Sequence, residues 1–238
     1  MRIFPDVRLD GLSASRGEML RYLGYRGQAL EGTMLEAVER CAALAEQSAS
    51  PRFVAEELSP VRITEEGAEL EGLLLPGEDI RLHLGWSSAA VLMGVTLGTQ
   101  MERLIQYHRR RSMADAVMID AAATALIEAA CDQVEEGLRA FYRQKELDVT
   151  DRFSCGYGDL PLETQPDIVR LLDAPRAIGL TCSSSLILIP QKSVTAILGV
   201  IPAGTHRSVR GCQSCKNRQN CQYRKEGIFC GHSSQASQ

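Results

Sequence analysis

The feature that most constrains the fold is a long helical segment, predicted from Ser112 to about Lys145. Ser112 can cap the first turn, and Asp115 follows three residues on, a pattern close to a capping box. Ala-rich turns within residues 121–130 give the segment high helix propensity and allow close packing. At 1.5 Å per residue, such a helix is about 50 Å long. Other elements must therefore pack along it, and we expect it to be the central helix of the protein.

Hydrophobic periodicity predicts shorter helices and strands on both sides of this helix. The expected helices cover residues 18–22, 27–47, 100–111 and 164–172. The expected strands cover residues 53–58, 61–64, 68–75, 87–97, 178–189 and 194–201, the last two joined as a hairpin by residues 190–193. Because helices and strands are segregated along the chain, the sequence predicts an α+β fold with helices packed on a mainly antiparallel, twisted sheet.

Composition sets the class of protein and its expected organisation. With 45% hydrophobic and 24% charged residues, the chain is neither wholly disordered nor fibrous. We expect an N-terminal helical and β segment over 1–85, a core over 86–202, and a basic Cys-rich tail over 203–238. No window approaches the roughly 20 apolar residues of a membrane span, and the N-terminus has no secretory apolar core. A cytoplasmic protein is therefore expected.

The C-terminal tail contains four of the eight cysteines: Cys212, Cys215, Cys221 and Cys230. Four thiolates within so short a stretch suit structural zinc or an iron–sulfur cluster, and the spacing does not separate the two. His232 could replace one cysteine. The alternative is a disordered tail with free thiols. Six basic residues against one acid make the tail positive, whereas the rest of the chain is acidic.

Four residues in and after the long helix could bind a small molecule. Arg152 has a forked donor that matches a carboxylate, and Gly156 lets the backbone approach a ligand closely. Tyr157 offers a flat face for an adenine ring or a sulfonium. Glu128, among alanines and a cysteine in the helix, could face a cleft and accept hydrogen bonds. From composition alone, a solvated helix stripe and an ordinary turn with a surface arginine remain open.

The order of these residues resembles a known family. Arg152-x-x-x-Gly156-Tyr157, with Glu128 in the preceding helix, is similar to the S-adenosylmethionine-binding activation module of cobalamin-dependent methionine synthase. Residues 179–194, with their Pro-x-x-Ser-Val turn, resemble the module's hairpin, and residues 20–25 resemble its stand-alone bacterial relatives. The chain departs from the module at residues 183–185, which are three serines where the module has an acid.

The resemblance implies a subunit that reactivates methionine synthase, as a component of a methyltransferase. S-Adenosylmethionine would remethylate cob(II)alamin carried on a separate synthase chain, with one electron from a donor such as flavodoxin or ferredoxin. Arg152 would hold the ligand's carboxylate and Glu128 its polar groups, while Gly156 and Tyr157 shape the pocket. The task is to position an already activated methyl group, so no catalytic base is implied.

Two alternatives remain at this level. The chain could reactivate another corrinoid methyltransferase with the same ligand site. It could instead be a metal-containing interaction or nucleic-acid-binding module that uses its basic tail, with affinity that falls steeply with salt. The acidic remainder and the low aromatic content, 5%, argue against nucleic acid.

Overall fold

The computed structural model describes residue 4 and residues 7–25, 32–205 and 219–220. The chain forms two compact units, Met1–Ala203 and Gly204–Gln238, and all helices and strands named below belong to the first. The four cysteines predicted as metal ligands, Cys212, Cys215, Cys221 and Cys230, lie outside the described residues. No described helix has the length and hydropathy needed to cross a membrane.

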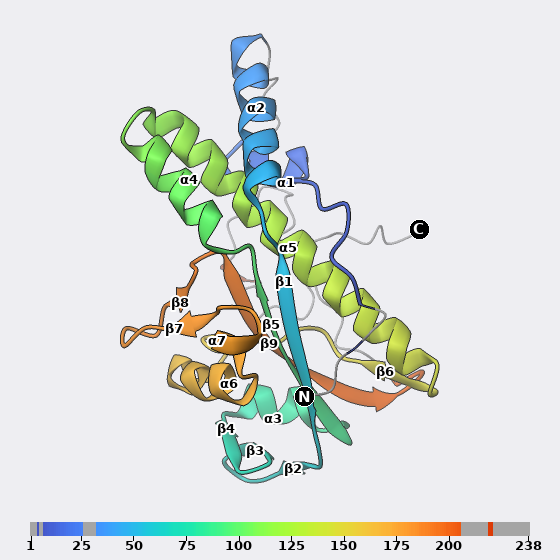
Figure 1. Cartoon of the computed structure of the whole chain (residues 1–238). Coiled ribbons are helices and arrows are strands. Elements are labelled where there is room, and N and C mark those ends of the chain that lie inside the picture. The colour runs from blue at the N-terminus through green and yellow to red at the C-terminus, as the bar shows by residue number, and fades with distance from the viewer. Residues whose placement is uncertain (1–3, 5–6, 26–31, 206–218, 221–238) are drawn as a thin grey trace. The chain divides into compact units, whose positions relative to one another are not determined.

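A four-stranded antiparallel sheet forms the centre of the first unit (Figure 1). Its order is β1 (Arg52–Leu58), β5 (Ala89–Thr96), β9 (Ser193–Pro202) and β6 (Leu147–Val149). Every residue of β5 is buried, as its small apolar sequence predicts. The α+β class and the antiparallel sheet predicted from the sequence are confirmed.

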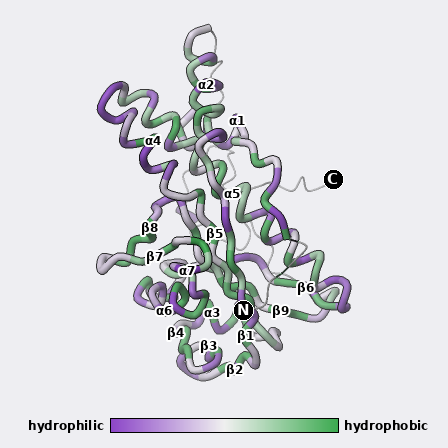
Figure 2. The backbone as a smooth tube through the Cα atoms, in the orientation of Figure 1, coloured by the Kyte–Doolittle hydropathy of each residue, from purple (hydrophilic) through white to green (hydrophobic). Residues whose placement is uncertain are grey.

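Helices cover one face of this sheet. They are α1 (Arg16–Tyr22), α2 (Thr33–Ser48), α4 (Thr99–Arg109) and α5 (Met113–Arg143). Val91, Met93 and Val95 of β5 contribute to the core on this side, together with apolar residues of the helices. In Figure 2, α4 is largely hydrophilic in colour, as expected for a helix at the edge of this layer.

Smaller elements cover the opposite face, where Ala90 and Leu92 of β5 contribute to a second core. The alternation of neighbouring β5 residues between the two cores follows from the two-residue period of a strand. These elements are α3 (Glu78–Leu84), α6 (Gln165–Leu171), α7 (Ala174–Ala177), the 3₁₀ turn η1 (Leu162–Thr164), the sheet β2 (Val61–Ile63), β3 (Gly67–Leu70) and β4 (Leu73–Pro76), and the pair β7 (Thr181–Cys182) and β8 (Leu188–Ile189).

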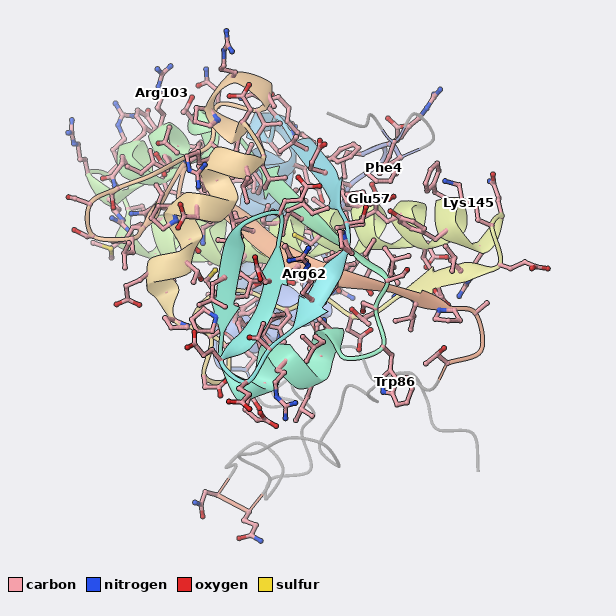
Figure 3. All side chains as sticks on the ribbon, turned by 90° about the horizontal axis from the view of Figure 1, so that it is seen from below. Phe4, Glu57, Arg62, Trp86, Arg103 and Lys145 are labelled. Carbon is pink, nitrogen blue, oxygen red and sulfur yellow. The ribbon has the colours of Figure 1, made fainter. Side chains whose placement is uncertain are left out.

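The long helix α5 has 31 residues and begins where the sequence predicts. The Ser112 side chain accepts a hydrogen bond from the Asp115 backbone N–H at 3.2 Å. Near the other end, Phe4 packs edge-on against Phe141, with ring centroids 5.1 Å apart. In contrast to Phe4, which is buried, Trp86 between α3 and β5 is 80% exposed (both are labelled in Figure 3).

Two expectations about the strands were wrong, and one helix was missed. The single strand expected over 68–75 is two strands, because Glu71 and Gly72 both have positive φ and turn the chain back. The expected 178–201 hairpin does not form, since β9 pairs with β5 and β6 while β8 pairs with β7. The helix α3 was not predicted.

Candidate functional site

A row of polar residues follows one side of α5 at intervals of three or four positions, so its members share one face of the helix. We call this row the polar stripe: Asp120, Thr124, Glu128, Asp132, Glu135 and Arg139. Its exposure changes along the helix. The side chains of Glu128 and Asp132 are 46% and 36% exposed, whereas that of Glu135 is 11% exposed and that of Arg139 is 5% exposed.

Arg152 reaches this stripe from the loop that follows β6. The next residue, Phe153, exchanges two backbone hydrogen bonds with Ile197 of β9, at 2.9 and 2.8 Å. This bridge extends the sheet by one residue, and Phe153 packs against the core on the face away from α5. Because neighbouring residues of an extended chain point to opposite faces, Arg152 is directed toward α5.

The Arg152 guanidinium contacts three carboxylates of the polar stripe. Nη2 lies 2.6 Å from Asp132 Oδ1 and 3.4 Å from Glu128 Oε2, and Nε lies 3.1 Å from Glu135 Oε2. The fold therefore brings together Glu128 and Arg152, which were predicted as site residues. It adds Asp132 and Glu135, which sequence reasoning did not assign, although their four- and seven-residue spacing from Glu128 was a usable signal.

The negative charges around Arg152 offset the effect of burial on its pKa. Burial by itself would lower the pKa of Arg152, but its electrostatic interactions with Cys131 and with the three carboxylates outweigh burial, so the pKa is raised. Burial raises the pKa of Cys131, which lies inside α5, to about 12. The Cys131 thiol is therefore protonated at neutral pH, and the negative charges that face the guanidinium there are those of the three carboxylates.

This arrangement fits the polar groups of an amino acid or nucleoside derivative. A guanidinium pairs with a carboxylate, and half-exposed carboxylates attract an ammonium or sulfonium and accept hydrogen bonds from hydroxyls. S-Adenosylmethionine carries each of these groups. Glu128 is the most exposed partner of Arg152 and also makes its longest contact, so it is the contact most easily exchanged for a ligand.

The Gly-rich loop after Arg152 is held against α3. Asp159 accepts hydrogen bonds from the backbone N–H groups of Glu78 and Asp79 at 2.7 and 3.0 Å. Gly158 has a φ of +57°, which favours glycine, and a Cβ there would lie 2.2 Å from an Asp79 carboxylate oxygen and would displace that side chain. The close approach of the backbone at Gly158 is therefore an approach to α3.

The other two predicted site residues lie in the same loop. Gly156 has a φ of +83°, and its backbone N–H donates to Leu160 O at 2.9 Å. Tyr157 is 68% exposed. In the part of the chain described, no hydrogen bond or ring contact joins Tyr157 to Arg152 or Glu128.

A second cation contacts the polar stripe nearer the N-terminus of α5. Lys192, in the Pro-x-x-Ser-Val turn before β9, places Nζ 3.0 Å from Asp120 Oδ2 and 2.8 Å from Thr124 Oγ1. The same turn is held to α4, because the Gln191 backbone N–H donates to the Glu102 carboxylate. The turn that carried part of the family resemblance is thus fixed against the helix that carries Glu128.

Helix α1 adds an aromatic residue to the neighbourhood of Glu128. Burial raises the pKa of Tyr22, Arg21 opposes the rise, and the negative charge of Glu128 adds to it. The Arg21 guanidinium lies over the Tyr22 ring, 4.4 Å from its centroid. Residues 20–25, which resembled stand-alone relatives of the activation module, therefore include a side chain that interacts electrostatically with Glu128.

Among the residues that the structure describes, no group of three or more His, Cys, Asp or Glu side chains could hold a metal ion. The four tail cysteines lie outside this search. Cys41, Cys131, Cys155 and Cys182 are free cysteines.

Comparison with known proteins identifies a similar fold among solved structures. No protein-family model and no curated protein matches the sequence. A solved structure, described as the crystal structure of the MetH reactivation domain bound to AdoHcy, matches with a TM-score of 0.55 and 15% identity over 88% of this chain and 80% of that chain. At this identity the likeness concerns the fold, and it agrees with the resemblance seen in the sequence: the chain has the fold of the MetH reactivation domain.

Proposed function

We propose that this chain binds S-adenosylmethionine at the Arg152 cluster and serves in the reductive methylation of cob(II)alamin carried by a separate methionine synthase chain. The observation that carries the proposal is the 3.4 Å contact of Arg152 with Glu128, in a fold shared with a reactivation domain crystallised with AdoHcy. These are the two residues that the family resemblance assigned to the ligand.

The roles of the residues follow from their charges and exposure. Arg152 binds the carboxylate of the ligand in exchange for one of its present partners. Glu128 and Asp132, which are half-exposed, attract the positive charges of the ammonium and sulfonium groups. Gly156 and Tyr157, in the adjoining loop, border the adenosyl part. The methyl group leaves a sulfonium without the help of a base, so the contribution of the protein is orientation.

The first test is isothermal titration of the intact protein with AdoHcy. Binding is expected, and Arg152→Ala should weaken it by about 100-fold, the scale of a lost charge-assisted, two-point contact. The matched control is Arg170→Ala, which removes an exposed arginine paired with Asp167 at 2.9 Å. No binding by the unmodified protein would overturn the proposal.

The second test addresses the partner. The protein is mixed with synthase in the cob(II)alamin form, S-adenosylmethionine and reduced flavodoxin, and the visible spectrum is followed. Methylcobalamin should form only when all components are present, and Arg152→Ala should slow its formation. Ligand binding without any methylcobalamin would leave the ligand site standing and reject methionine synthase as the partner.

We also propose that the four tail cysteines bind zinc or an iron–sulfur cluster. Elemental analysis of protein purified without air should find close to one equivalent of zinc, or iron with a visible thiolate-to-iron absorption. Replacement of Cys212 and Cys215 by serine should remove the metal. A metal-free protein with reactive tail thiols would contradict this proposal.

A further inference from the structure

Arg152 is held on two sides, and the two sides differ. Asp132 and Glu128 contact Nη2 from the partly exposed side, while Glu135 contacts Nε from the buried side at 3.1 Å. A ligand carboxylate can replace the exposed contacts, but it cannot reach the Glu135 contact without displacing a side chain that is only 11% exposed.

Glu135 is itself fixed by a second arginine. Its Oε1 accepts a hydrogen bond from Arg139 Nη2 at 2.8 Å, while its Oε2 faces Arg152. Arg139 Nη1 donates to Asp148 Oδ1 at 2.8 Å and to Val149 O at 2.7 Å. A continuous series of contacts therefore runs from the backbone of β6 through Arg139 and Glu135 to Arg152.

We propose that Glu135 is a positioning residue for the ligand: it holds the Arg152 guanidinium in place while the ligand exchanges with Glu128 or Asp132. This inference rests on the proposed function. An arginine side chain has many rotamers, and ordering it on binding costs affinity. Contact at Nε restricts the guanidinium plane without occupying Nη2, so Glu135 supplies this order before the ligand arrives.

The test compares two ligands with the variant Glu135→Gln, which keeps the shape of the side chain and removes its charge. AdoHcy has the carboxylate that Arg152 would bind, whereas 5′-methylthioadenosine has the same adenosine thioether without the amino acid part. The variant should weaken AdoHcy by about tenfold, as loss of a supporting contact does, and leave 5′-methylthioadenosine unchanged. A merely structural role would weaken both. The matched control is Glu136→Gln, at the exposed neighbouring position of α5.

A second variant tests whether Glu135 affects the affinity for AdoHcy through Arg152. Arg152→Lys has no Nε–H group to contact Glu135. Adding Glu135→Gln to Arg152→Lys should therefore cause no further loss of AdoHcy affinity. If Glu135→Gln does not fold, Glu135→Asp, which keeps the charge on a shorter side chain, should show the same discrimination between the two ligands.

The outcomes separate this inference from the proposed function. If the unmodified protein does not bind AdoHcy, the proposed function fails. If it binds AdoHcy and Arg152→Ala strongly weakens binding, but Glu135→Gln affects neither ligand or both equally, only the positioning role is overturned.

Discussion

The C-terminal part of the polar stripe and its middle part contain the same chemistry in different surroundings, and we call them the Arg139 end and the Arg152 end. At one end, Arg139 is paired with Glu135 and Asp148, and all three side chains are at most 13% exposed. At the other end, Arg152 meets Glu128 and Asp132, which are half-exposed. Each end is an arginine among carboxylates, and Glu135 contacts both arginines.

The difference shows which pair can exchange partners. Buried charges are expensive to separate, because the partner that is left behind stays in a medium of low polarity. Half-exposed carboxylates are solvated when their partner leaves, so their exchange costs little. The Arg139 end is therefore a structural joint between α5 and β6, and the Arg152 end is suited to binding.

The largest effect is expected at the buried end. Arg139→Ala removes the closest cation, 2.8 Å away, from the buried carboxylates of Glu135 and Asp148, and should lower the free energy of unfolding by about 3–5 kcal/mol. The measurement is urea denaturation followed by circular dichroism. Arg143→Ala, which removes a half-exposed arginine 3.7 Å from Asp148, is the control and should cost under about 1 kcal/mol. Equal losses would remove the contrast between the two ends.

An intermediate effect is expected for Arg152. Its own side chain is 11% exposed, but two of its three carboxylate partners can be solvated after it is removed. Arg152→Ala should therefore lower the free energy of unfolding by about 2 kcal/mol, less than Arg139→Ala. The same denaturation series measures it. A loss as large as that of Arg139→Ala would make the Arg152 cluster a structural joint as well.

A smaller effect should appear at alkaline pH. The pKa of Cys131 is raised from 9.0 to about 12 by burial, so the unfolded chain loses this proton first. The stabilisation that comes from the buried, protonated Cys131 thiol is complete below pH 9 and is lost as the pH rises toward 12. About 1 kcal/mol of it is lost by pH 10. Cys131→Ala should reduce the fall in stability between pH 8 and 10, whereas Val134→Ala, which shortens a buried side chain of α5 that does not titrate, should not. Identical slopes for these two variants would contradict the burial of Cys131.

The smallest effect on stability is expected for Glu128. Its side chain is 46% exposed and makes the longest of the three contacts with Arg152. Glu128→Gln should change the free energy of unfolding by less than about 0.5 kcal/mol while weakening AdoHcy by about tenfold. A stability loss without a loss of binding would reverse the roles assigned to the two ends.

The parts of the fold that depend on local sequence were predictable. The Ser112 cap fixed the start of α5, and the apolar run of β5 identified a buried strand. The pairing of β9 with β5 and β6 was not predictable. The strand expected over 178–189 is nearer in the chain, and the sequence does not indicate which of these strands pairs most stably with β9. The Glu71-Gly72 turn was missed because the alternation of residues 68–75 continues through it.

The candidate site was partly predictable, and for a similar reason. Arg152 and Glu128 were chosen because their order in the chain resembles a family. The contacts of Arg152 with Asp132 and Glu135 depend on where the loop after β6 crosses α5, and the Phe153 bridge to Ile197 determines that crossing. Nothing near Arg152 in the sequence specifies this bridge.

The contacts of the polar stripe also differ in the length of chain that each one closes. Arg139 and Asp148 are nine positions apart, whereas Lys192 and Asp120 are 72 apart. The entropic cost of closing a loop grows with the logarithm of its length. Closing the loop between Asp120 and Lys192 therefore costs about 2 kcal/mol more than closing the loop between Arg139 and Asp148. We therefore expect α5 and β6 to associate early in folding and the turn at Lys192 to dock late, so that the Arg152 cluster is completed between a preformed joint and a late-arriving strand.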